Sequence, residues 1–116
     1  MILNKTKKLA IAANSRTCKT LISNAIGLMF SKKIADFGLI FVFDKPKKAG
    51  LHMFFVFFPI DVLFLDEKKK VIELKRGFKP FTLYYPKKKA KYILELPKDT
   101  IKSTSTEIGD EVMFIA

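Results

Sequence analysis

Beyond the first third of the chain, short apolar runs alternate with polar breaks that are rich in lysine. The breaks contain proline, glycine or aspartate, which favour turns. Short apolar runs at such regular spacing predict β-strands in a small barrel or a curled sheet. The predicted strands are Leu39–Phe43, Leu51–Phe58, Ile60–Leu65, Val71–Lys75, Thr82–Tyr85, Lys91–Leu96 and Val112–Ile115.

The N-terminal third combines a strand pattern with a helix pattern. Leu9 to Ala13 predicts an early strand that pairs with Met1 to Leu3. Apolar residues then recur at helical spacing from Leu21 to Met29, which predicts about three turns of amphipathic helix. A helical turn is also expected within Pro97 to Thr106. The predicted fold class is mostly β (α+β): a barrel-like or strongly curled antiparallel sheet of about seven strands, with one N-terminal amphipathic helix.

Composition indicates a globular protein that folds without disulfides or metals. The chain has 116 residues, of which 49% are hydrophobic, so we expect one domain over residues 1–116. The single cysteine, Cys18, and the single histidine, His52, exclude an internal disulfide and a Cys/His zinc site. We therefore expect no metal and no cofactor, and a reducing cytoplasm is the simplest location.

No stretch of the sequence is long enough to predict a membrane span. The longest apolar run, Leu51 to Ile60, falls well short of the ~20 residues that a spanning helix needs. The short apolar piece Leu9 to Ala13 does not resemble a signal-peptide core. We expect a monomer or a weak homodimer.

Charge is the most pronounced compositional feature. The 22 Lys and Arg exceed the 11 Asp and Glu, for a formal net charge of +11. Such an excess favours an anionic partner, nucleic acid or a membrane surface, and affinity for it would fall with added salt. Almost all of the cations are lysine and glutamine is absent, however, which is also typical of a heat-adapted or AT-biased proteome. Both interpretations stay open.

Nine lysines gather in three clusters, each at a predicted strand-to-strand turn. At such turns exposed lysines ordinarily resist aggregation. If the chain turns back at Pro59, the three turns lie at one end of the sheet and form a polybasic surface. If Pro59 only bends a continuous strand, the clusters divide between the two ends. The candidate polyanion-binding residues are Lys45, Lys47, Lys48, Lys68, Lys69, Lys70, Lys87, Lys88 and Lys89.

Asp61 and Arg76 are the two most informative charged positions outside the lysine clusters. Asp61 lies in an apolar run, where a carboxylate must be paired, protonated or at a wet rim. It either accepts backbone N–H bonds after Pro59 or anchors a ligand at the mouth of a pocket. Arg76 stands out because the chain otherwise prefers lysine, and its planar guanidinium suits a carboxylate such as Glu95 or Asp61. An anion-binding role is the alternative.

His52, Met53 and Met29 complete the candidate ligand site. His52 opens the phenylalanine-rich run and is either structural or a residue of the site. A hydrolase that uses His52 and Asp61 is conceivable, but no nucleophile motif accompanies them, so we predict no catalytic residue. The phenylalanines of residues 54–58 indicate burial on both faces or, if one face stays open, a groove. Tyr84 and Tyr85, beside a lysine cluster, are compatible with base stacking and equally with an ordinary strand.

Five segments, in order along the chain, resemble the domain-of-unknown-function 192 family. They are Gly27-Leu28-Met29-Phe30, Gly38-Leu39-Ile40-Phe41-Val42-Phe43, the run from Pro59 to Asp66, Tyr92-Ile93-Leu94-Glu95-Leu96 and Ile108-Gly109-Asp110. The resemblance implies a small β-rich domain of unassigned activity, in a family whose bacterial members are often exported. Typical members carry an aromatic-Met-Lys-Asn-Thr stretch before the Pro-Ile-Asp segment, where this chain has His52-Met53-Phe54-Phe55-Val56.

The sequence favours a non-enzymatic binding or accessory module. Its site would lie near Asp61, with His52, Met53, Met29 and Arg76 around it, and would take a small ligand or a protein. A basic surface that binds nucleic acid or another polyanion is the first alternative. The hydrolase is the second.

Overall fold

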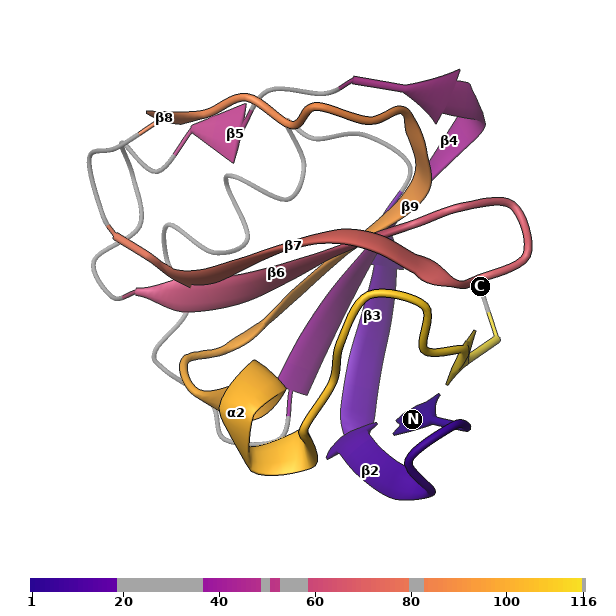
Figure 1. Cartoon of the computed structure of the whole chain (residues 1–116), viewed down its shortest axis with the longest axis vertical. Helices are drawn as coiled ribbons and strands as arrows, with labels where there is room; N and C mark the ends of the chain where they lie inside the picture. The colour runs from indigo at the N-terminus through magenta and orange to yellow at the C-terminus, as the bar shows by residue number, and fades with distance from the viewer. Residues whose placement is uncertain (19–36, 49–50, 53–58, 80–82, 116) are drawn as a thin grey trace.

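A computed structural model describes residues 1–18, 37–48, 51–52, 59–79 and 83–115 (Figure 1). The elements before the longest gap are β1 (Ile2–Asn4), β2 (Leu9–Ala12) and β3 (Asn14–Cys18). After it come β4 (Phe37–Lys47), β5 (Leu51–His52), β6 (Ile60–Leu65), β7 (Val71–Phe78), β8 (Leu83–Tyr84), β9 (Ala90–Pro97), α2 (Thr100–Thr104) and β10 (Val112–Met113). The predicted pairing of the first two strands is confirmed, since β1 and β2 are antiparallel.

The described strands form three sheets that do not close into a barrel, so the predicted barrel is wrong. Their orders are β10-β1-β2, β3-β4-β9-β6-β7 and β5-β8, and the edge strands β3 and β7 do not pair with each other. The large sheet is mixed, because β3 runs parallel to β4 whereas its other pairs are antiparallel. The strands of this sheet do not lie side by side in the order of the sequence. Instead, β9 returns from far along the chain to lie between β4 and β6.

The helix prediction needs a similar correction. The structure opens on a strand, and the segment from Leu21 to Phe30 lies outside the described residues. In the described part of the chain, helix is confined to α2, within the predicted Pro97 to Thr106 segment. No helix among the described residues is long and apolar enough to cross a bilayer.

The large sheet carries a hydrophobic cluster on each face. We call the side with Leu39, Phe41, Phe43, Ile60, Val62, Phe64, Phe78, Ala90 and Ile93 the phenylalanine face. The opposite side, with Ile40, Leu63, Leu65, Leu94 and Leu96, packs against residues of β1, β2, α2 and β10, and we call it the terminal face. Figure 1 shows α2 and the small N-terminal sheet together on one side of the large sheet. Burial on both faces explains why every residue of β6 is buried.

Candidate functional site

Asp61 is a buried connection between three elements. Asp61 lies in β6, and its side chain points to the face of the sheet opposite to that of Ile60 and Val62. The residue is only 1% exposed. One oxygen accepts the N–H of Gly77 in β7 and the other accepts the N–H of Ile101 in α2, each at 2.9 Å. These bonds match the structural alternative for Asp61, a carboxylate satisfied by backbone N–H groups.

Gly77 and α2 explain why a carboxylate is needed at this position. Gly77 has a φ of 55°, a left-handed conformation that glycine adopts readily, and it lies where the β6–β7 register shifts. The N-cap residue of α2, Asp99, makes no side-chain capping bond. Asp61 therefore supplies, from a distant strand, an acceptor for the first turn of the helix.

Glu95 is the one buried side chain of the described residues with an unsatisfied polar atom. It lies in β9 between Leu39 of β4 and Val62 of β6, on the phenylalanine face. Its Oε2 has no hydrogen-bond partner. Burial in these apolar surroundings raises the pKa of the Glu95 carboxyl to about 8. At neutral pH the group is therefore mostly a neutral acid, which can donate as well as accept a hydrogen bond.

The structure brings together little of the predicted ligand site. Arg76 is exposed, and neither of its expected carboxylate partners pairs with it, because Asp61 bonds to backbone N–H groups and Oε2 of Glu95 has no hydrogen-bond partner. His52 lies in β5 opposite Leu83, but its side chain is outside the described part of the chain. Met29 and Met53 are outside it altogether, as are the phenylalanines of residues 54–58.

Strand register places the three lysine clusters at one end of the large sheet. Since β9 is antiparallel to both β4 and β6, the latter two run in the same direction. Lys47 at the end of β4 is opposite Ala90 at the start of β9, and Leu65 at the end of β6 is opposite Tyr92. This is the arrangement expected if the chain returns before β6. We call these nine lysines the basic sheet end.

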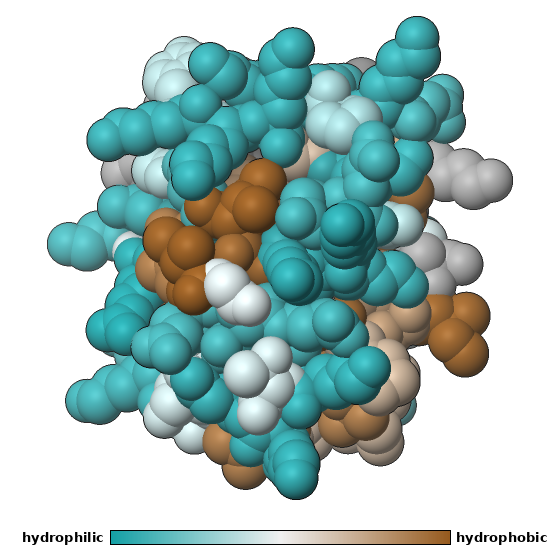
Figure 2. All heavy atoms as spheres, turned by 45° about the vertical axis from the view of Figure 1, so that its right-hand side comes forward, coloured by the Kyte–Doolittle hydropathy of each residue, from teal (hydrophilic) through white to brown (hydrophobic). Residues whose placement is uncertain are grey.

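The basic sheet end is largely hydrophilic at its surface. In Figure 1 the end of β4 and the β6–β7 turn both lie on the right-hand side. Figure 2, which brings that side forward, shows hydrophilic side chains over most of the surface and hydrophobic ones in small areas. Lys45, Lys48, Lys68, Lys70 and the Lys87 to Lys89 cluster are exposed.

Lys69 differs from the other lysines of this end. Its Nζ donates to the carbonyl oxygen of Phe114 at 2.7 Å and lies 4.3 Å from the centre of that ring. It also lies 5.7 Å from the Tyr92 ring. Cation–π and hydrogen-bond contacts of this kind hold the ammonium against the C-terminal segment. Lys69 was predicted to bind a polyanion, but its contacts indicate a structural role.

A second carboxylate, Glu73 of β7, organises the lysine-rich segment that follows β8. It accepts hydrogen bonds from the Tyr84 hydroxyl and from the backbone N–H groups of Lys87 and Lys88, the latter at 2.9 and 3.1 Å. Burial, together with the hydrogen bond to Glu73 and its charge, raises the pKa of Tyr84 to about 12. No sequence pattern predicted this contact, because strand alternation does not identify a partner across sheets.

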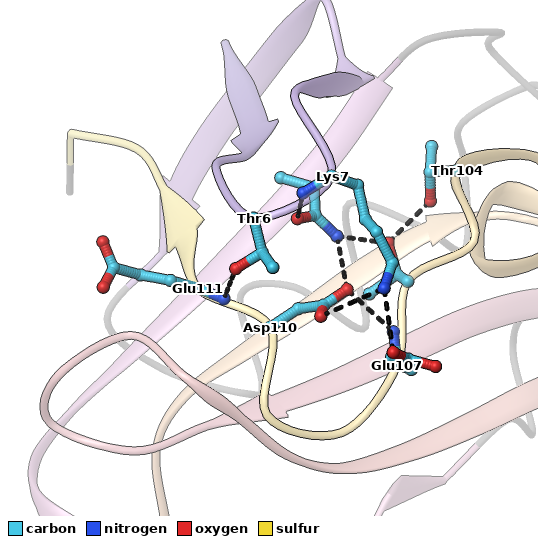
Figure 3. Close-up of polar contacts among 8 residues, drawn as sticks. Thr6, Lys7, Thr104, Glu107, Asp110 and Glu111 are labelled. Carbon is cyan, nitrogen blue, oxygen red and sulfur yellow. Dashed lines mark hydrogen bonds and ion pairs between the residues drawn. The ribbon is translucent and has the colours of Figure 1, made fainter.

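A buried polar cluster joins the β1–β2 turn to the C-terminal segment (Figure 3). The Asn4 amide donates to Thr106 and Asp110 at 3.0 Å each, and its oxygen accepts the Lys7 N–H at 2.9 Å. The hydrogen bond to Glu107 raises the pKa of Lys7. Burial alone would raise the pKa of Asp110, but hydrogen bonds from Asn4 and the Glu107 N–H, with the charge of Lys7, lower it. The Asn4, Lys7 and Asp110 groups satisfy one another, which indicates that the cluster holds the two segments together.

Replacing Asn4 with alanine should lower the free energy of unfolding by about 2 kcal/mol, because two buried hydrogen bonds and a partly buried one are lost together. Urea denaturation measures the change. Lys5→Ala is the matched control, since the Lys5 side chain makes an exposed ion pair with Glu111, the loss of which should cost less than about 0.5 kcal/mol. Equal stability of the two variants would contradict a locking role for Asn4.

Comparison with known proteins identifies the family. The model of the DUF192 family (Uncharacterized ACR, COG1430) matches residues 2–114. The chain belongs to this family. The resemblance inferred from the five sequence segments is thereby confirmed. Because the family has no assigned activity, membership leaves the function of this DUF192 chain to its own residues.

Relatives from hyperthermophilic genera and one solved structure extend the comparison. The UPF0127 protein of Thermococcus sibiricus is 37% identical over 97% of this chain and 73% of its own length. The UPF0127 protein PH1112 of Pyrococcus horikoshii is 35% identical over 97% of this chain and 96% of its own. A crystal structure from Sinorhizobium meliloti 1021, described as a "putative transcription regulator", has a TM-score of 0.79. It is 22% identical over 85% of this chain and 79% of its own, so it shows a shared fold.

Proposed function

We propose that this DUF192 chain is a non-enzymatic binding domain whose basic sheet end binds a polyanion. The observation that carries the proposal is the register that gathers three lysine clusters at one end of the sheet. Clustered cations raise the local potential and bind an anionic polymer by releasing its counterions. The nearby carboxylates accept hydrogen bonds from backbone N–H groups of the lysine clusters. Glu73 accepts those of Lys87 and Lys88, and Asp66 accepts those of Lys68 and Lys70.

A small-ligand site at Asp61 has less support. Both carboxylate oxygens already accept backbone hydrogen bonds, and the residue is buried. The same bonds weigh against a hydrolase in which Asp61 would orient His52. The basic sheet end therefore ranks above both alternatives.

The related structure and the cysteine content both bear on the proposal. The description of the Sinorhizobium protein as a transcription regulator would fit a polyanionic partner, although that likeness by itself shows only the fold. A cytoplasmic location is part of the proposal and rests on the single cysteine. The relatives come from thermophiles, whose proteins are often rich in lysine. The experiment therefore has to separate a lysine excess that binds a polyanion from one that only reflects composition.

The test is fluorescence anisotropy with labelled heparin over a salt series from about 50 to 200 mM. We expect affinity to fall steeply with salt. The triple variant Lys68→Gln, Lys70→Gln, Lys88→Gln should bind more weakly, with a slope of log affinity against log salt that is smaller by about 2 to 3, because three cations no longer neutralise the polymer.

The matched control removes three positive charges from the opposite end of the sheet. Arg76, Lys98 and Lys102 are exposed; Arg76 lies near the end of β7, Lys98 follows β9 and Lys102 lies in α2. The variant Arg76→Gln, Lys98→Gln, Lys102→Gln has the same net charge as the first. Retained heparin affinity in the control supports a localised surface. Equal losses in both variants would mean that only net charge matters and would overturn the proposal.

A further inference from the structure

The structure separates the two adjacent tyrosines that precede the last lysine cluster. Tyr84 is directed inward, where its ring lies 5.7 Å from that of Phe64 and 6.3 Å from that of Phe78. Tyr85 is directed outward and is 71% exposed. An exposed tyrosine alone is ordinary in a soluble protein. Its setting distinguishes this one.

The segment that carries Tyr85 is anchored on both sides of that residue. Before it, the hydroxyl of Tyr84 donates to Glu73, and after it the N–H groups of Lys87 and Lys88 donate to the same carboxylate. Pro86 is buried and restricts the residue before it to extended conformations. The exposed ring is therefore presented from a backbone with few alternatives, which lowers the entropy cost of stacking a ligand on it.

The anchored segment adjoins two lysine clusters. Lys87, Lys88 and Lys89 directly follow Pro86, and Glu73 lies three residues after Lys70 in the chain. Glu73 also pairs across the sheet with Phe64, next to the β6–β7 turn. The exposed ring of Tyr85 is thus separated by one residue in the chain from a run of cations that can follow a phosphate backbone. Proteins that bind single-stranded nucleic acid combine these same two features.

We infer that the polyanion is single-stranded nucleic acid, and that one base stacks on Tyr85 while the lysines of the basic sheet end contact phosphates. This inference rests on the proposed function, because it names the class of polyanion bound at the same surface. In a duplex the faces of the bases are already stacked on one another, so a single strand is preferred. Heparin has the charge but no bases.

The test compares wild type, Tyr85→Ala and Tyr85→Phe on four labelled probes: short single-stranded RNA, single-stranded DNA of the same sequence, the matching duplex, and heparin. At constant salt we expect Tyr85→Ala to weaken binding of single strands about tenfold, the loss typical of one stacked base. Tyr85→Phe should bind like wild type, because phenylalanine keeps the ring. The RNA and DNA arms show which sugar is preferred.

Three readouts separate stacking from a general loss of structure or charge. For Tyr85→Ala, heparin affinity and the salt slope on single strands should stay at wild-type values. An abasic strand should bind wild type about as weakly as the normal strand binds Tyr85→Ala, since each lacks one partner of the stack. Unchanged single-strand affinity in Tyr85→Ala, or duplex binding as tight as single-strand binding, would overturn the inference while leaving polyanion binding in place. No binding of heparin or of any nucleic acid would instead overturn the proposed function.

Discussion

Replacing Glu95 with glutamine should raise the free energy of unfolding by roughly 3 kcal/mol at pH 7. The folded protein holds the Glu95 carboxyl at a pKa of about 8, against an ordinary value of 4.5. Below pH 4.5 the group is protonated in both states, so its full contribution to stability is present. As the pH rises through about 8, the unfolded chain releases its proton first and stability is lost. Glutamine has no proton to release, so it removes this loss.

Urea denaturation at several pH values measures the effect. We expect wild type and Glu95→Gln to differ little at about pH 4, and the difference to grow as the pH approaches 8. Glu67→Gln is the matched control, because Glu67 is exposed in the β6–β7 turn and its replacement should leave the pH profile of wild type in place. Parallel profiles for wild type and Glu95→Gln would contradict a buried neutral acid at this position.

Replacing Asp61 with alanine should lower the free energy of unfolding by about 3 to 5 kcal/mol. The substitution removes a buried carboxylate and leaves the N–H groups of Gly77 and Ile101 without acceptors. Asp61→Asn should cost less, because the amide keeps one acceptor oxygen, but its NH₂ group then faces the other N–H. Both variants should still bind heparin under conditions where they are folded, since Asp61 lies near the start of β6 and the basic sheet end lies at the end of that strand.

Amide hydrogen exchange gives the residue-level test. In Asp61→Asn we expect one of the two amides, Gly77 or Ile101, to lose protection while the other keeps it. Asp44→Ala is the control, because the Asp44 side chain is exposed and its removal should change stability by less than about 0.5 kcal/mol. Protection of both amides at wild-type levels in Asp61→Ala would show that the carboxylate does not hold these elements together.

The candidate site was predictable only in part. Lysine clusters at turns were visible in the sequence. Their position at one end of the sheet was predicted only for one of two alternatives, in which the chain turns back before β6. Backbone N–H groups were one of the two alternatives for Asp61, beside a ligand, but the sequence did not indicate that the N–H groups come from Gly77 and Ile101. The expected pairing of Arg76 with Glu95 or Asp61 was wrong, because Asp61 bonds to backbone N–H groups and Oε2 of Glu95 has no partner. The inward direction of Tyr84 and the outward direction of Tyr85 depend on the hydrogen bond from Tyr84 to Glu73, which no local sequence pattern indicated.

By itself the sequence determined the family, the strand-rich character and the places where most strands lie. These depend on local properties: alternation of side chains along a strand, turn residues between strands, and ordered segments shared with relatives. Only the tertiary structure decided that β9 lies between β4 and β6, that the sheets stay open, and that Oε2 of Glu95 is buried without a hydrogen-bond partner. Strand order and burial are set by contacts between residues far apart in the chain. Many pairings of the same short strands satisfy the same local pattern, so packing of the whole molecule selects among them.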